Sequence, residues 1–111
     1  MSAVRDAAAL LRILEAEVDR RARRREVDAL RSPAAQVEAW RAVFGGDWFD
    51  VTRVLLVALR DPRVSRALQA AGCRSLRPCK VRAALRHLYL AGVLERSVVD
   101  RRVAYRVKVG A

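Results

Sequence analysis

Two cysteines and one histidine are the residues with the most distinctive potential chemistry in this chain. Cys73 and Cys79 are separated by five residues, which is not a common zinc-ligand spacing, and His87 is the single histidine. A metal site would need both thiols, the imidazole and a further ligand from elsewhere. The sequence also contains no glycine-rich phosphate loop, no His-Glu zinc motif and no plausible triad around the histidine. We therefore predict no enzymatic activity, no metal site and no cofactor.

Arginine dominates the charged residues. Lysine and arginine number 23 against 12 aspartates and glutamates, which gives a net charge of +11. Such an excess attracts polyanions and raises their encounter rate, and the guanidinium group is suited to gripping phosphate with a fork of donors. We therefore expect nucleic acid as the partner. An anionic membrane, an acidic protein and a codon bias toward arginine remain alternative explanations of the charge.

The segment that opens at Pro78 is predicted to be a helix that runs to Ala91 and stops at Gly92. Its expected buried stripe consists of Val81, Ala84, Leu85 and Leu88. The surface that remains presents Lys80, Arg82, Ala83, Arg86 and His87. The major groove of DNA accepts one helix, and the residues in the first two turns of that helix reach deepest into the groove. We expect Lys80, Arg82 and Ala83 to read bases, whereas Arg86 is expected to hold phosphate.

Beyond Gly92 the periodicity changes to that of a strand. Inward positions alternate with more polar ones, and the inward set is Val103, Tyr105, Val107 and Val109. Residues 94–99 can pair with this strand across a turn at 100–102. Arg101 and Arg102 at the tip could enter the minor groove or hold the backbone. Arg74 and Arg77 precede the helix and are placed to meet phosphate near its positive end.

The first part of the chain, from residue 3 to about residue 30, contains no glycine or proline and predicts a long helix. One stripe of this helix is expected to form a dimer interface and consists of Val4, Ala7, Leu11, Leu14 and Val18, widened by Leu10 and Ile13. Arg21 and Arg25 occupy the next positions, so a long coiled coil is not expected. The basic run 20–25 is either a solvated helix end, paired locally with Asp19, Glu26 and Asp28, or a patch that binds phosphate or a protein partner.

Three further helices are marked by capping residues. Ser32-Pro33 opens a helix to about Phe44, Asp50 opens 51–60, and Asp61-Pro62 opens 62–71. The helix 51–60 is apolar nearly all round, which predicts a central, buried position. The N-terminus has no long apolar run behind a basic start, and no segment approaches the length of a membrane span. We therefore expect a cytoplasmic protein with reduced thiols and no membrane contact.

A winged helix has this order of elements, in which three helices are followed directly by a hairpin. In this respect the chain resembles winged-helix transcriptional regulators of the ArsR and MarR kind. The resemblance is closest in residues 80–96, where five residues fill the family's Leu-x-x-Leu-x-x-x-Gly-Leu-Val-type segment: Leu85, Leu88, Gly92, Val93 and Leu94. The turn 100–102 and the strand 103–107 are similar to the family's basic wing. The match covers about half the chain, from Asp50 onward. The chain lacks a cysteine pair within a helix, as metal-sensing members often have, so no metal-sensing role is expected.

The resemblance implies a mainly α protein with a C-terminal β-hairpin. We expect a winged helix-turn-helix DNA-binding domain at residues 50–111, preceded by an N-terminal helical dimerisation region at 1–49. The function expected is that of a sequence-specific double-stranded DNA-binding regulator, a repressor, whose homodimer places two recognition helices about one helical turn apart. Two alternatives stay open: a small protein-interaction factor that binds RNA polymerase or another protein, and a non-specific architectural or replication DNA binder.

Overall fold

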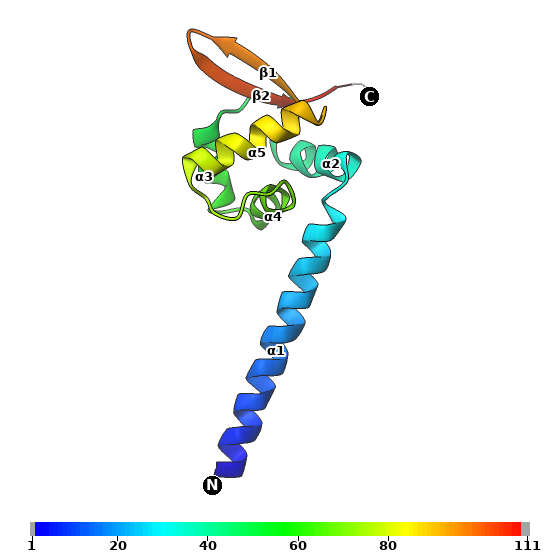
Figure 1. The fold of residues 1–111 in the computed structure, drawn as a ribbon, viewed down its shortest axis with the longest axis vertical. Helices are drawn as coiled ribbons and strands as arrows, with labels where there is room; N and C mark the ends of the chain where they lie inside the picture. Colours follow the sequence, from blue (N-terminus) through cyan, green and yellow to red (C-terminus); the bar gives the residue numbers. More distant parts are fainter. Residues whose placement is uncertain (1, 110–111) are drawn as a thin grey trace.

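The computed structural model describes residues 2–109, with side chains described from Arg5 to Val109. These residues form helices α1 (Ser2–Ala29), α2 (Pro33–Phe44), α3 (Val51–Ala58), α4 (Pro62–Ala70) and α5 (Pro78–Leu90), followed by strands β1 (Leu94–Val99) and β2 (Arg102–Val107). Figure 1 shows α1 projecting away from the other helices, with the hairpin at the opposite end of the molecule. The prediction of a mainly helical chain with a C-terminal hairpin is confirmed.

Side-chain caps fix where α2 and α3 begin. The hydroxyl of Ser32 accepts a hydrogen bond from the amide of Ala35 at 3.2 Å. The carboxylate of Asp50 accepts one from the amide of Arg53 at 2.9 Å. Each cap satisfies an amide that has no partner within the helix, so the helix starts at the residue that follows the cap. Both predicted caps are confirmed.

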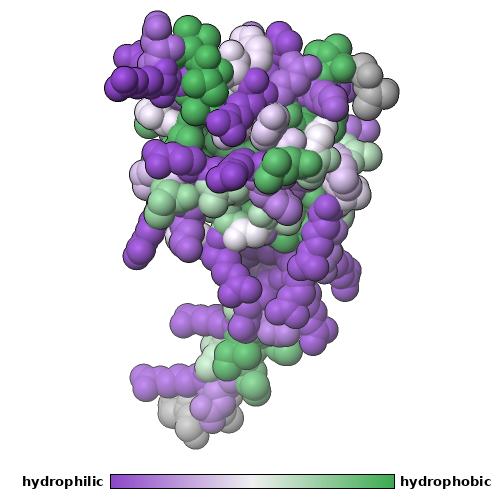
Figure 2. Space-filling model, turned by 45° about the horizontal axis from the view of Figure 1, so that its top comes forward, coloured by the Kyte–Doolittle hydropathy of each residue, from purple (hydrophilic) through white to green (hydrophobic). Residues whose placement is uncertain are grey.

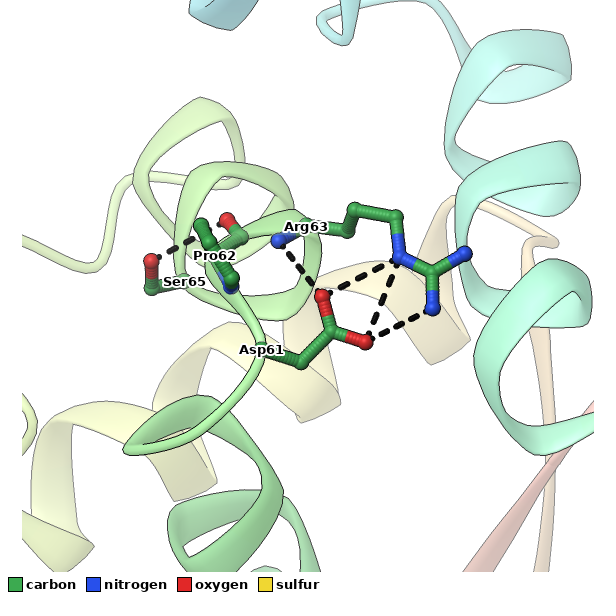
Figure 3. A network of polar contacts seen from close by, with 4 residues as sticks. All are labelled: Asp61, Pro62, Arg63 and Ser65. Carbon is green, nitrogen blue, oxygen red and sulfur yellow. Dashed lines mark hydrogen bonds and ion pairs between the residues drawn. The ribbon is translucent and has the colours of Figure 1, made fainter.

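The start of α4 is capped in the same way and carries an additional ion pair (Figure 3). Asp61 accepts a hydrogen bond from the amide of Arg63 at 3.0 Å and also binds its guanidinium, 2.8 Å away, while the Ser65 hydroxyl donates to the Pro62 carbonyl. The hydrogen bonds from the Arg63 side chain and amide hold the pKa of Asp61 below its usual value. The charged form of this carboxyl is therefore the one that caps the helix.

The hydrophobic core joins α2 to the C-terminal elements. Trp40, Phe44 and Phe49 stack on one another, with ring centroids 4.3 Å apart for the two phenylalanines and 5.7 Å apart for each phenylalanine and Trp40. Phe49 also exchanges two backbone hydrogen bonds with Tyr105 of β2, at 2.8 and 2.7 Å. The hairpin is thereby anchored to the segment before α3. One core cluster therefore takes residues from both sides of the predicted boundary at 49/50.

One buried polar side chain links three helices. Gln36 of α2 is 2% exposed and donates to the carbonyls of Leu30 and Ala67 at 2.7 and 3.0 Å. Its oxygen accepts the indole N–H of Trp40 at 2.8 Å. Every polar atom of this amide group that lies in the core has a partner, so the network fixes α2 against α4 and against the end of α1.

The expectation that α3 is the central, buried helix is wrong. Within it only Val54 and Ala58 are buried, whereas Leu56 is 59% exposed and Leu59, which ends it, is 73% exposed. The helix has two turns and packs on α4 and α5 along one face only. A sequence that is apolar nearly all round was compatible with burial on several sides, but the short helix lies at the surface. The helix with the longest buried stripe is α5.

The turn after α5 places the hairpin directly beside that helix. Gly92 has a φ of 82°, in the left-handed region that favours glycine. The amide of Val93 donates to the carbonyl of Leu88, and that of Gly92 donates to Tyr89, so the chain reverses within two residues. The predicted return strand is shorter than expected, because β2 ends at Val107 and Val109 is 69% exposed instead of facing inward.

Helix α1 contacts the remainder of the protein only near its C-terminal end. Glu26 forms an ion pair with Arg66 of α4 at 2.6 Å. The long axis of the molecule measures 67 Å, against 27 and 19 Å for the others, because most of α1 lies beyond the packed helices (Figure 1). Among the described residues, no helix combines the length and the apolar character that crossing a membrane would require.

Candidate nucleic-acid interface

Helix α5 separates an apolar face from a cationic one. Its buried residues are Val81, Ala84, Leu85 and Leu88, as the spacing predicted. Its exposed residues include all five that were expected on the outer surface: Lys80, Arg82, Ala83, Arg86 and His87. At 100° per residue, Arg82 and Arg86 lie on one flank of the helix, whereas Lys80 and His87 lie on the other flank. The two pairs therefore face different surroundings.

The hairpin presents two arginines at its tip. Val99 pairs with Arg102, which leaves Asp100 and Arg101 as a two-residue turn. Both turn residues have positive φ, 50° and 65°, which is the geometry of a type I′ hairpin turn. Glycine or asparagine is usual in the second of these positions, and a left-handed arginine costs about 1 kcal/mol or more. Arg101 is therefore exposed and has a mildly strained backbone conformation at the tip of the hairpin.

A cleft of about 590 Å³ lies between the cationic flank of α5, the hairpin and the start of α3. Five arginines line it: Arg82, Arg86, Arg96, Arg101 and Arg102. The remaining lining residues are Asp50, Val51, Thr52, Val103 and Tyr105. The one carboxylate among them already accepts the capping hydrogen bond from the Arg53 amide. Five arginine residues around one hollow create a strongly positive potential there, and we call this hollow the arginine cleft.

Arg96 completes this group and was not predicted from the sequence. It lies on β1 directly across from Tyr105, and its guanidinium carbon lies 5.6 Å from the centre of the Tyr89 ring of α5. Cation–π contact of this kind holds the arginine against the helix. The hairpin register could have revealed it, because residues directly opposite each other in paired strands share a face of the sheet.

The opposite face of the hairpin uses its arginine differently. Arg106 binds Glu95 with its side-chain nitrogens at 2.6 and 3.1 Å, and its guanidinium lies 4.4 Å from the centre of the Trp48 ring. A guanidinium that is already paired with a carboxylate and stacked on an indole has fewer free donors for a ligand. Arg102 lies on this same face by register and also lines a second hollow of about 560 Å³ beside Ser97, Val99 and Ala104, so it borders both faces of the hairpin.

The structure brings together four of the predicted DNA-contacting residues and leaves the others apart. Arg82, Arg86, Arg101 and Arg102 share the arginine cleft. Arg74 lies beside a different hollow of about 320 Å³, which is also lined by Leu59 and Gln69. The other predicted contacts are exposed but do not line the arginine cleft: Arg77, Lys80, Ala83 and His87.

The basic run in α1 forms few of its expected local pairs. Arg20 and Arg21 both bind Glu17, at 3.1 and 3.2 Å, in place of the flanking acidic residues that were expected. Glu26 reaches across to α4, and Asp28 pairs with Arg31 at 3.1 Å, outside the run. These exposed ion pairs contribute little to stability but reduce the free positive charge of the run.

The two thiols occupy different environments. Cys73 is buried, donates to the carbonyl of Ser75 at 3.1 Å, and has its pKa raised by burial, so it stays protonated. Cys79 is exposed at the start of α5. Within the part of the chain that the structure describes, no three histidine, cysteine or acidic side chains gather as metal ligands would.

In chemical terms, the arginine cleft can hold an extended polyanion. Guanidinium groups donate paired hydrogen bonds to phosphate oxygens, and several of them in one hollow can contact successive phosphates of a strand. Comparison with known proteins found no matching family model, no matching curated protein and no matching solved structure.

Proposed function

We propose that this protein binds double-stranded DNA through the arginine cleft and the exposed face of α5. The observation that carries the proposal is the convergence of five arginines from α5, β1, the hairpin turn and the start of β2 on one hollow. A DNA backbone crossing this hollow would place its phosphates between α5 and the hairpin. Neutralising several phosphates in this way supplies most of the affinity of a DNA-binding protein.

In this proposal, α3, α4, α5 and the hairpin form a winged helix of the kind found in ArsR and MarR regulators. Its support is the element order, with α5 followed at once by the hairpin, and the exposure of the α5 residues expected to meet DNA. Lys80, Arg82 and Ala83 would read bases in the major groove. Arg86, Arg96 and the turn arginines would hold the backbone. Arg74, Arg77 and His87 would contact flanking phosphates if the duplex extends past the cleft.

The biological role that follows is that of a transcriptional repressor that occupies its target site. This step depends on the proposed fold and not on particular residues. The repressor would act as a homodimer through α1, in which Ala7, Leu11, Leu14 and Val18 are exposed and available. Val4 belongs to the same predicted stripe, but its side chain lies outside the described residues.

Selection of bound duplexes from a random pool tests the proposal. A sequence-specific regulator enriches one motif, whereas a non-specific architectural binder retains duplexes of every sequence. The comparison of Arg82→Ala with Arg101→Ala then assigns roles within the cleft. Arg82→Ala should relax the preference at one base pair at a cost of about 1–3 kcal/mol, and Arg101→Ala should weaken binding to all sequences alike.

A protein-interaction role is the second candidate, and the exposed apolar stripe of α1 favours it. Leu10, Leu11, Ile13 and Leu14 are each about 60% exposed. A protein-interaction factor would bind duplexes weakly and without preference, and it would enrich no motif in the same selection. Such a result, together with equal small effects of both arginine substitutions, would contradict DNA binding as the function.

A further inference from the structure

The stripe on α1 leaves an unusual amount of apolar surface in contact with water. Leu10, Leu11, Ile13, Leu14 and Val18 are between 59% and 65% exposed. Figure 2 shows this apolar surface on the projecting part of α1, separated from the globular part by strongly hydrophilic side chains. A single helix gains nothing from such a stripe unless another surface covers it.

The arginines that follow the stripe constrain what can cover it. Arg21 and Arg25 continue the three- and four-residue spacing of Leu11, Leu14 and Val18, so they lie on the same face of α1. If two copies of α1 paired in parallel, each of these arginines would face its own counterpart within the seam. Like charges at such positions oppose association, and the net charge of +11 on each chain adds to the repulsion between neighbouring globular parts.

We propose that α1 pairs with a second copy of this chain in antiparallel orientation. In the register that best matches the stripes, Leu11 packs on Leu14 of the second copy, and Ala7 packs on Val18. Arg21 then lies at the first turn of the second helix, and Arg25 lies beyond its end. The apolar overlap is covered, and the basic runs are at opposite ends of the pair.

This orientation fixes the separation of the two points at which α1 joins the globular parts. The ends of the two α1 helices at Ala29 are separated by about 33 residues of helix, or about 50 Å at 1.5 Å per residue. Adjacent half-sites one helical turn apart are separated by only about 34 Å. The two globular parts would therefore attach to the pair farther apart than one helical turn of DNA, which differs from the one-turn spacing expected from the sequence. The inference rests on the proposed self-association of α1 and not on DNA binding.

Sedimentation of the full chain as a function of concentration tests the pairing. The overlap spans fewer than the three to four heptads typical of a stable coiled coil, so we expect a reversible dimer in the micromolar range or weaker. Leu14→Glu should shift the protein to a monomer. Leu59→Glu replaces an even more exposed leucine at the C-cap of α3, 73% against 59%, and should leave the dimer unchanged. A monomer at all concentrations up to about 1 mM would overturn the proposal. Sedimentation of that monomer with anionic phosphatidylglycerol vesicles would then show that a membrane surface, and not a second copy, covers the stripe.

Orientation is measured with one spin label per chain. Arg31→Cys places a thiol just after α1, in a Cys79→Ser background that removes the exposed native thiol. Pulsed electron–electron double resonance should give a distance of about 50 Å between the labels for the antiparallel pair, and a distance below about 30 Å for a parallel pair. A short distance, or loss of the dimer in Leu59→Glu but not in Leu14→Glu, would overturn the assignment. Neither measurement involves DNA, so its outcome is independent of whether the arginine cleft binds a duplex.

Discussion

The guanidinium of Arg96 lies over the ring of Tyr89, with 5.6 Å between the guanidinium carbon and the ring centroid. The contact joins β1 to α5 at the wall of the arginine cleft, so it holds the hairpin and the helix at a set separation. The ring also orients one of the five arginines without consuming its hydrogen-bond donors, which remain free for phosphate. Tyr89 is therefore a positioning residue in the proposed DNA site.

Removal of the Tyr89 ring should weaken DNA binding without unfolding the protein. An exposed cation–π contact is worth about 0.5–1 kcal/mol, so Tyr89→Ala should lower duplex affinity by about two- to fivefold. Tyr89→Phe keeps the aromatic face and should bind like the unaltered protein. Fluorescence anisotropy with a labelled duplex measures both. An equal loss in the two variants would show that the hydroxyl, and not the ring face, matters.

The strained turn allows stability to be separated from function. Arg101→Gly relieves a left-handed arginine, so the free energy of unfolding should stay level or rise by up to about 1 kcal/mol. The same change removes one cation from the arginine cleft and should weaken binding to every duplex. Urea denaturation and anisotropy on one preparation measure the two effects. Lower stability together with unchanged binding would contradict the role assigned to Arg101.

The network around Gln36 should be costly to break. Gln36→Leu retains most of the volume but leaves the Trp40 indole N–H without a partner in the core and removes the amide that bridges the carbonyls of Leu30 and Ala67. Each unsatisfied buried group costs about 1–3 kcal/mol, so the urea midpoint should fall clearly. Glu38→Leu, at an exposed position of the same helix, is the control and should change the midpoint little. A neutral Gln36→Leu would show that water replaces the lost contacts.

The cap of α4 predicts a dependence of stability on acid. Arg63 holds the pKa of Asp61 below its usual value of 3.8, so the folded state releases this proton more readily than the unfolded chain does. The stabilisation is present above the usual pKa and is lost as the pH falls through it toward the lowered value. Asp61→Asn should therefore have a lower melting temperature at neutral pH. The difference from the unaltered protein should shrink below about pH 4. A constant difference across that range would assign the effect to packing.

Local chemistry explains why much of this fold could be predicted from the sequence. Ser32, Asp50 and Asp61 each cap a helix through one side-chain oxygen, which is a contact within a few residues of chain. The stripe of α5 and the hairpin register likewise depend on short-range periodicity. Long-range packing is not encoded in this way. The burial of α3 was overestimated because nothing in its own residues shows which of its faces another helix covers.

The candidate site also combines residues that local periodicity predicts with a residue that only long-range packing places there. Arg82 and Arg86 follow from the helix period, and Arg101 and Arg102 follow from their place in the turn. Arg96 joins them only once β1 is paired with β2 and set against α5. The separation of Lys80 and His87 from the arginine cleft also depends on which flank of α5 meets the hairpin.

The salt dependence of duplex binding tests the central claim most directly. If the arginine cleft holds the DNA backbone, the logarithm of the binding constant should fall steeply with the logarithm of salt concentration. Arg86→Ala/Arg102→Ala should reduce the magnitude of this slope by about 2, because two phosphate contacts are lost. Arg12→Ala/Arg60→Ala removes the same charge from exposed positions outside the cleft and should leave the slope unchanged. Equal slopes for the two double variants, or binding that is insensitive to salt, would contradict the assignment of DNA binding to the arginine cleft.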